Sequence, residues 1–318
     1  MKQILVSGSS AYDILMHFDW SFKKQFSENI DSSINMSVVS PVFHKNHWGT
    51  WANICYNLAL LGENAILLSS IWEDFTFSDI IKDKINLKYI HKEPFSPSSH
   101  SVIISDESDN RITVFHSWAM ENASASKFNY IEENIWTSII SANNITTMIE
   151  HAKASKSQWI FTVLDPAQQI SQMTEEQLRI FLSYWDLLIA NHYEYSDIQK
   201  KIQKTWNDIL QDFEYIIVTY WDQGSQLISK DETIHIPAVS IWDIEDTTWA
   251  GDAYRAWLLY SIIEWLDIKT WCQLWSVLAS YCILTSGSQQ HHFSFWWVTT
   301  DMKERFGIDI DFHNKRKY

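Results

Sequence analysis

Short apolar runs alternate with longer amphipathic segments along most of the chain, and this alternation constrains the fold more than any other feature. The apolar runs predict buried strands at 4–6, 65–70, 159–164, 187–190 and 215–219. The amphipathic segments predict helices at 52–61, 174–184, 253–263 and 270–284. Strands followed by helices are typical of a parallel sheet with helices on both faces, in which ligands bind at the carboxyl ends of the strands. We therefore expect an α/β protein whose functional residues follow its strands.

Two stretches, about 14–46 and 92–118, do not follow this alternation. They contain period-two patterns, such as 35–39 and 101–104, that favour strands. No internal repeat, low-complexity tract or flexible linker divides the chain. We therefore expect residues 1–318 to form a single domain, with these two stretches projecting from it as a small β-strand lid.

The charge and the cysteines exclude several classes of protein. A net charge of -15 gives no electrostatic footprint for phosphate backbones, which argues against nucleic acid as a partner. Cys55, Cys272 and Cys282 form neither a disulfide framework nor a metal-type pair. The apolar run at the N-terminus is too short for a signal peptide, and no run reaches the ~18 apolar residues of a membrane span. We expect a cytoplasmic protein that binds a small molecule and no membrane.

Glycine is rare and tryptophan is abundant in this chain. There are 7 glycines and 18 tryptophans among 318 residues, so glycine makes up about 2%, where about 7% is usual. The two residue types together make up about 8%, close to the usual share of glycine alone. The positions of the tryptophans therefore need to be compared with those where turns require glycine.

The segment 246–257 carries the most chemical information. A short loop of small and polar residues leads into a predicted helix, whose free N–H groups and dipole form an anion site. Asp252 lies at the first turn of this helix, where a carboxylate can take the proton of an alcohol that attacks a phosphoryl group. Alternatively, Asp252 is only a helix cap, since aspartate is favoured near helix N-termini.

This segment resembles the Asp-Thr-x-Gly-Ala-Gly-Asp signature of the ribokinase-like (PfkB) sugar and nucleoside kinases, with Trp249 in place of a glycine. The resemblance extends from about residue 3 to about residue 307 and implies the α/β fold of that family. It implies that Asp252 is the catalytic base. It also implies that Trp249, Ala250 and Gly251 form the anion hole for the phosphoryl group.

The resemblance implies ATP and Mg²⁺ as cofactors. Residues 191–194 match the family's Asn-x-x-Glu motif, whose glutamate, here Glu194, helps to hold the metal and phosphates through water. The alternative for Glu194 is a solvated helix residue. Asn191, Thr219, Trp221 and Gly224 lie in segments that are similar to the family's ATP-binding segments. A Walker-type phosphate loop is absent from the sequence.

The acceptor side resembles two further family motifs. Residues 9–13 resemble the Gly-Ser-x-x-x-Asp start, whose aspartate binds sugar hydroxyls because a carboxylate accepts two hydrogen bonds. The alternative for Asp13 is an Asx-turn residue. Residues 47–53 resemble the Gly-Gly-x-x-x-Asn turn and helix. The acceptor residues implied by the family are Ser9, Asp13, Ser37, Gly49 and Asn53.

Three features resemble bacterial adenosine kinases in particular. Residues 165–169, which include Gln168 and Gln169, are similar to their Asp-Pro-Ser-Gln-Gln stretch, and residues 287–289 are similar to their Gly-Thr-Gln. Phe115 matches an aromatic residue that stacks on the purine, a contact worth roughly 1–3 kcal/mol, although it also suits the core of the lid.

The resemblance therefore implies phosphorylation of the 5′-hydroxyl of adenosine, a reaction of purine salvage. Two alternatives remain. One is a kinase for ribose, fructose or another nucleoside. The other is a non-catalytic nucleoside- or sugar-binding module, if a real Trp249 blocks the anion hole. The sequence does not distinguish a monomer from a homodimer.

Many tryptophans stand where the family has glycine. Trp48, Trp221, Trp249 and Trp257 each occupy a family glycine position, and Trp72 and Trp118 lie in similar turns. A lineage that reads the codon UGA as glycine would show this pattern if its gene were translated with UGA as tryptophan. We therefore predict that these letters correspond to glycines. The alternative is a tryptophan-rich core or sugar-stacking surface, and the codons distinguish the two.

Overall fold

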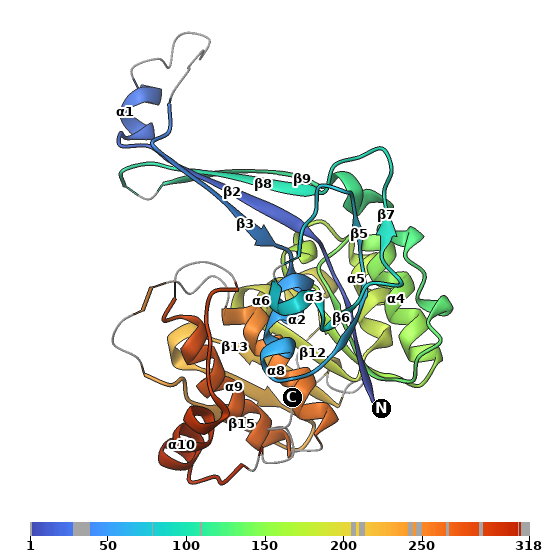
Figure 1. Ribbon diagram of the computed structural model, residues 1–318. Helices are drawn as coiled ribbons and strands as arrows, with labels where there is room; N and C mark the ends of the chain where they lie inside the picture. The colour runs from blue at the N-terminus through green and yellow to red at the C-terminus, as the bar shows by residue number, and fades with distance from the viewer. Residues whose placement is uncertain are drawn as a thin grey trace.

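The computed structural model describes residues 2–27, 39–77, 79–108, 110–204, 208–209, 214–240, 244–245, 250–264, 267–285, 289–310 and 312. Within them, a nine-stranded sheet runs in the order β15-β14-β13-β12-β11-β10-β1-β4-β6, with helices on both faces (Figure 1). A smaller four-stranded sheet, in the order β3-β2-β8-β9, projects from this body. Among the described helices, none is long and apolar enough to cross a membrane.

The strands of the large sheet confirm the predicted α/β class. They are β1 (Gln3–Ser7), β4 (Ala65–Leu68), β6 (Ile85–Asn86), β10 (Ile135–Ser141), β11 (Phe161–Asp165), β12 (Leu187–Asn191), β13 (Tyr215–Thr219), β14 (Ser225–Ile228) and β15 (Thr233–Ile236). The strands from β6 to β13 are parallel, whereas β14 and β15 add an antiparallel edge. The two edge strands are short and are joined by tight turns, so the strand–helix alternation does not predict them.

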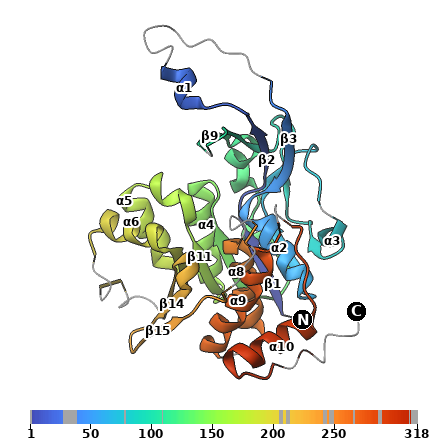
Figure 2. The ribbon, with the colours of Figure 1, turned by 90° about the vertical axis from the view of Figure 1, so that its left-hand side faces the viewer.

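Helices cover both faces of the large sheet (Figure 2). One face packs against α2 (Thr50–Leu60), α8 (Ala250–Ile263), α9 (Ile268–Cys282) and α10 (Phe295–Phe306). The other packs against α4 (Ile145–Ser157), α5 (Glu175–Phe181) and α6 (His192–Ile202). Successive strand residues point to opposite faces, so in β1 Ile4 and Val6 join the first core and Leu5 joins the second. Because both faces are buried, most of the central strands read as continuous apolar runs, whereas β10 contains Thr137, Ser138 and Ser141.

Local hydrogen bonds determine where several of these elements begin. The hydroxyl of Thr174 caps α5 by accepting from the backbone N–H of Gln177 (3.2 Å), as the sequence predicts. The predicted helix over 174–184 divides into α5 and a short 3₁₀ helix, η4 (Leu182–Tyr184). The strand predicted from Trp159 is wrong at its start. Trp159 has a left-handed backbone (φ 61°) after α4, and β11 begins at Phe161.

The small sheet consists of β2 (Ala11–His17), β3 (Val42–Trp48), β8 (Ser99–Ser105) and β9 (Arg111–His116). These strands overlap the two stretches expected to form the lid, but β2 begins earlier than expected. Of the predicted strand pattern at 35–39, residues 35–38 lie outside the described residues, and Val39 is not in a strand. The remaining elements are α1 (Phe22–Ser27), α3 (Asp79–Lys82), β5 (Ser70–Ile71), β7 (His91–Lys92), η1 (Trp118–Ala125), η2 (Phe128–Tyr130), η3 (Ala167–Ser171) and η5 (Trp221–Gln223).

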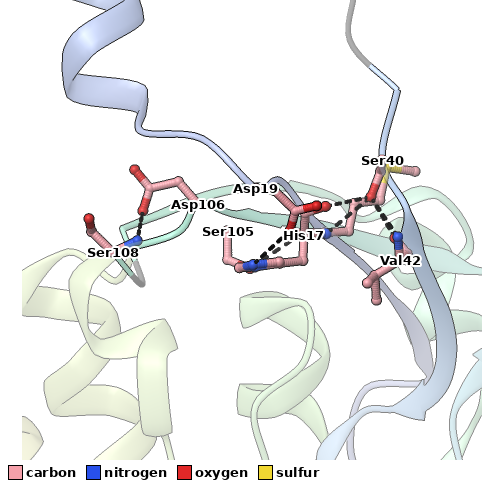
Figure 3. A network of polar contacts seen from close by, with 8 residues as sticks. His17, Asp19, Ser40, Val42, Ser105, Asp106 and Ser108 are labelled. Carbon is pink, nitrogen blue, oxygen red and sulfur yellow. Dashed lines mark hydrogen bonds and ion pairs between the residues drawn. The ribbon is translucent and has the colours of Figure 1, made fainter.

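A network of polar contacts joins the strands at the outer end of the small sheet (Figure 3). Nδ1 of His17, at the end of β2, lies 3.0 Å from Oγ of Ser105, at the end of β8. The Ser40 hydroxyl accepts from the backbone N–H of His17 (3.2 Å). The carboxylate of Asp106 accepts from the backbone N–H of Ser108 (2.9 Å). Although burial opposes it, hydrogen bonding of this kind lowers the pKa of Asp106 to about 2. The outer end is therefore held by side-chain contacts as well as by the strand ladder.

Candidate active site

Asp252 and Asn53 come together where two helices begin. Asp252 lies in the first turn of α8, and Asn53 lies near the start of α2. Nδ2 of Asn53 donates a hydrogen bond to Oδ2 of Asp252 at 2.8 Å. Burial raises the pKa of Asp252 to about 7, although the positive charge of Arg255 and the hydrogen bond from Asn53 oppose the shift. A carboxyl group with a pKa near neutrality can both take and release a proton.

Arg255 is a site residue that the sequence reasoning missed. Its Nε contacts Oδ2 of Asp165 at 2.5 Å, and its Nη2 contacts Oδ1 at 2.6 Å. Asp165 ends β11, is fully buried, and also accepts from the hydroxyl of Ser141 (2.8 Å). The available signal was spacing, because a residue three positions after Asp252 shares its helix face. The bidentate pair joins the first turn of α8 to the end of the central strand.

Gly251 lies against the guanidinium group of Arg255. A Cβ at Gly251 would lie 2.7 Å from Nη1 of Arg255, which is too close for a non-bonded contact. Glycine therefore lets the guanidinium group approach the backbone at the start of α8. Ala250 and Gly251 are the described part of the expected anion hole. Trp249 and the loop 246–248 lie outside the described residues.

Asn191 and Glu194 form the N-terminal cap of α6. Oδ1 of Asn191 accepts from the backbone N–H of Glu194 (2.9 Å), and Oε2 of Glu194 accepts from the backbone N–H of Asn191 (2.9 Å). Burial raises the pKa of Glu194, against the charge of Arg255, so this side chain is not merely a solvated helix residue. Among the described residues, no group of three or more His, Cys, Asp or Glu side chains could hold a metal ion.

Asp13 is a buried carboxyl group on the small sheet. Only 3% of the residue is exposed, and among the described residues its Oδ1 has no hydrogen-bond partner. Burial raises its pKa to about 7, against a hydrogen bond with Ser101. The strand register aligns Asn46, Asp13, Ser101 and Phe115 across all four strands, so their side chains share one face. This row brings an unpartnered carboxylate oxygen and a 41% exposed aromatic ring to one surface.

Gly49 forms the junction between the small sheet and α2. It has a φ of 111°, and a Cβ there would lie 2.1 Å from the carbonyl oxygen of Ser9. Only glycine allows this approach, which sets the start of α2 beside the end of β1. The same approach places Asn53, four residues later, within reach of Asp252. Ser37, the remaining predicted acceptor residue, lies outside the described residues.

Gln168 and Gln169 lie in η3, directly after Asp165 and Pro166 at the end of β11. Gln168 is exposed and Gln169 is half-buried. No hydrogen bond within the described part of the chain joins either side chain to Asp13 or Asp252. The structure places the two glutamines at the carboxyl edge of the large sheet without joining them to the other site residues.

Three predicted ATP-binding residues, Thr219, Trp221 and Gly224, lie at the end of β13 and in the turn that joins β13 to β14. Thr219 is the last residue of β13 and pairs with Ser225. Gly224 has a φ of 88°, and a Cβ there would lie 2.0 Å from the carbonyl oxygen of Ile236. Trp221 has a left-handed backbone (φ 53°) and is 61% exposed. The turn therefore needs glycine at position 224, and at position 221 it holds a tryptophan whose backbone is left-handed.

The sequence profile of the pfkB family of carbohydrate kinases matches residues 25–292. The nucleoside kinase of Methanocaldococcus jannaschii is 25% identical over 293 residues, which cover 91% of this chain and 93% of that protein.

Solved structures have the same fold. The Burkholderia thailandensis nucleoside kinase in complex with inosine aligns with a TM-score of 0.84 at 24% identity, covering 96% of this chain and 99% of that chain. Its complex with ADP-inosine aligns with a TM-score of 0.82 at 25% identity, covering 96% of this chain and 97% of that chain. The expected ribokinase-like fold is therefore confirmed.

Proposed function

This chain belongs to the pfkB family of carbohydrate kinases, and from that premise we propose that it phosphorylates the 5′-hydroxyl of a purine nucleoside. As a family member it is an ATP-dependent kinase that acts on a nucleoside or carbohydrate acceptor. Adenosine is the acceptor that the sequence favours. Inosine, ribose and fructose are the alternatives to be compared with it.

The placement of Asp252 supports the chemical step most directly. Its pKa of about 7 lets the carboxylate take the proton of the acceptor hydroxyl as the oxygen attacks the γ-phosphorus. The hydrogen bond from Asn53 holds one carboxylate oxygen, which fixes the direction of the other. The backbone N–H groups of the loop 249–251 and the dipole of α8 stabilise the charge on the phosphoryl group.

The small sheet supplies the acceptor-binding residues in this proposal. The unpartnered Oδ1 of Asp13 accepts hydrogen bonds from the ribose hydroxyls, and Phe115, in the same row, stacks on the base. Ser9, Ser37, Gly49, Gln168 and Gln169 complete the acceptor site. The complex of the Burkholderia thailandensis nucleoside kinase with inosine supports a purine nucleoside as the acceptor.

Asn191, Thr219, Trp221 and Gly224 would contact ATP in the proposed complex. Among the described residues no cluster of three or more carboxylates forms a metal site by itself, so Mg²⁺ would depend on the phosphates of ATP as well as on protein oxygens. Mg²⁺ commonly uses one or two carboxylates together with substrate phosphates, so Glu194 would hold it mainly through water and ATP. The bound ion would neutralise part of the phosphate charge.

The test is turnover of ATP with adenosine, inosine, ribose and fructose, by the wild type and two variants. Asp252→Asn is expected to fold and to lose most of its kcat, because the amide cannot take the proton. Asp231→Asn, at an exposed turn, is the matched control and should retain wild-type kcat. A wild type that phosphorylates only ribose or fructose would overturn the nucleoside proposal. An Asp252→Asn variant with near wild-type turnover would remove Asp252 from the role of base.

We further propose that many tryptophans of this sequence are glycines in the protein as its host makes it. The described residues contain six non-glycine residues with positive φ, and three of them are Trp118 (33°), Trp159 (61°) and Trp221 (53°). An L side chain disfavours this backbone region, whereas glycine does not. The codons and peptide mass spectra of the native protein test this proposal. UGG codons, or indole masses at these positions, would contradict it.

A further inference from the structure

Arg255 has more hydrogen-bonding capacity than its ion pair uses. Asp165 occupies Nε and Nη2, and no hydrogen bond within the described part of the chain involves Nη1. Nη1 instead lies beside Gly251, 2.7 Å from the position that a Cβ would occupy. One N–H-bearing corner of the guanidinium group therefore faces the backbone where α8 begins.

This corner is held in place. The Arg255 side chain is 12% exposed and its partner Asp165 is fully buried, so the ion pair is largely shielded from water. Two parallel hydrogen bonds fix the plane of the guanidinium group, and the Ser141 hydroxyl fixes the carboxylate. A lysine could not reproduce this arrangement, because its single ammonium group lacks the planar fork. The guanidinium group of arginine can bond Asp165 through Nε and Nη2 and still offer Nη1 to another group.

Arg255 supplies positive charge among several carboxyl groups. Asp165, Asp252 and Glu194 all interact electrostatically with Arg255. Asp165 is engaged by the bidentate pair, Asp252 is half-buried, and Glu194 caps α6. The positive charge of Arg255 therefore acts on both the proposed base and the residue proposed to hold the metal, and its Nη1 lies beside Gly251 of the proposed anion hole.

We propose that Arg255 is a catalytic residue whose Nη1 donates a hydrogen bond to the transferring γ-phosphoryl group. The inference rests on the proposed function. In the step, the acceptor oxygen forms a bond to the γ-phosphorus, the bond from that phosphorus to the β-phosphate bridging oxygen breaks, and ADP leaves with the electron pair. The hydroxyl proton goes to Asp252. Arg255 keeps its proton throughout and stabilises the charge on the phosphoryl oxygens.

The test must separate this role from a purely structural ion pair. Arg255→Met alone would leave Asp165 buried without a partner, so the main variant is Asp165→Asn with Arg255→Met, which removes both charges. Asp165→Asn alone and Arg255→Lys accompany it. Arg305→Met, at an exposed ion pair on α10, is the control. Thermal unfolding identifies the variants that fold, and kcat and KM are then measured from pH 6 to pH 9.

The double variant is expected to lose about 10²–10³ in kcat, the usual effect of removing one donor from a charged transition state. KM for both substrates should stay within a few-fold of wild type. The loss should persist at high pH. Arg305→Met should match the wild type.

Two results would overturn the inference while leaving the proposed function intact. One is a folded double variant with near wild-type kcat. The other is a loss that disappears at high pH, which would mean that Arg255 acts only through the ionisation of Asp252. A wild type that phosphorylates no acceptor would overturn the proposed function together with this role.

Discussion

Trp159 ends α4 in a conformation that two other helices reach with glycine. Its backbone N–H bonds to the carbonyl of Lys156 (3.1 Å), and the next N–H, of Ile160, bonds to Ser155 (3.3 Å). This pair of bonds is the Schellman motif, whose left-handed residue is usually glycine. Gly62 after α2 and Gly307 after α10 occupy the same position, with φ of 82° and 68°. We therefore expect Trp159→Gly to stabilise the protein.

The magnitude follows from two opposing effects. A side chain in the left-handed region costs about 1–2 kcal/mol, which glycine removes. Glycine also makes the unfolded chain more flexible, which offsets about 0.5–1 kcal/mol of the gain. The residue is 96% exposed, so little buried apolar area is lost. The expected net gain in the free energy of unfolding is about 0.5–1 kcal/mol.

Urea unfolding, followed by far-ultraviolet circular dichroism, measures this gain. The unfolding entropy of ~2.1 cal/mol/K per residue implies a rise in Tm of only about 1 °C for a chain of 318 residues, so the urea midpoint is the better measure. Trp159→Ala is the matched control, because it removes the indole but keeps the Cβ, and should give no comparable gain. Equal stabilisation by alanine, or destabilisation by glycine, would refute the reasoning about the backbone.

Three further predictions concern the site and the core. The carboxyl of Asp252 must be ionised to act as a base, so kcat/KM should fall as pH drops below about 7. Asn53→Ala removes a hydrogen bond that lowers this pKa and should move the acid limb to higher pH, whereas an unmoved limb would contradict the assignment. Gly49→Ala should lower the free energy of unfolding by more than about 2 kcal/mol, because its Cβ would meet the carbonyl of Ser9. A urea midpoint within error of wild type would show that the backbone at Ser9 and Gly49 can move apart at little cost. Burial lowers the pKa of His151 to about 4, so between pH 6.5 and pH 4 the unfolded state binds a proton that the folded state does not. The stability that His151 contributes above pH 6.5 should therefore be lost as the pH falls through this range. His151→Gln should flatten the dependence of the free energy of unfolding on pH.

Several central strands could be predicted from sequence because both of their faces are buried. The central strand β10, between β1 and β11, was not predicted, because Thr137, Ser138 and Ser141 interrupt its apolar residues. Leu187–Ala190 and Tyr215–Thr219 read as apolar runs, and the observed strands follow them closely. The edge strands β14 and β15 could not be predicted in the same way. Two of the four residues of β15 are exposed, and apolar and polar residues alternate in its sequence, so it carries no continuous apolar signal. Burial on both faces, rather than strand propensity, made the prediction possible.

The candidate site could be predicted only where local motifs carry it. Asp252 and Asn53 were each identified from a short pattern, although their contact spans 199 positions and no pattern predicts it. Arg255 was missed because its partner, Asp165, is 90 positions away. The left-handed backbone of Trp118 and Trp221 agrees with the glycine expected at these turns. Contacts between distant segments depend on the packing of whole elements, which single motifs do not encode.

The junction at Gly49 and Ser9 has a consequence for geometry. The chain passes between the two sheets at both residues, and the two passages touch, so together they form a natural pivot. At a strand rise of about 3.3 Å per residue, Asp13 lies roughly 13 Å from Ser9 and His17 roughly twice as far. Any rotation of the small sheet about this pivot would therefore displace its outer end about twice as far as the acceptor carboxylate. Such a rotation would therefore change the position of Asp13 relative to Asp252 less than it would change the position of the outer end of the sheet.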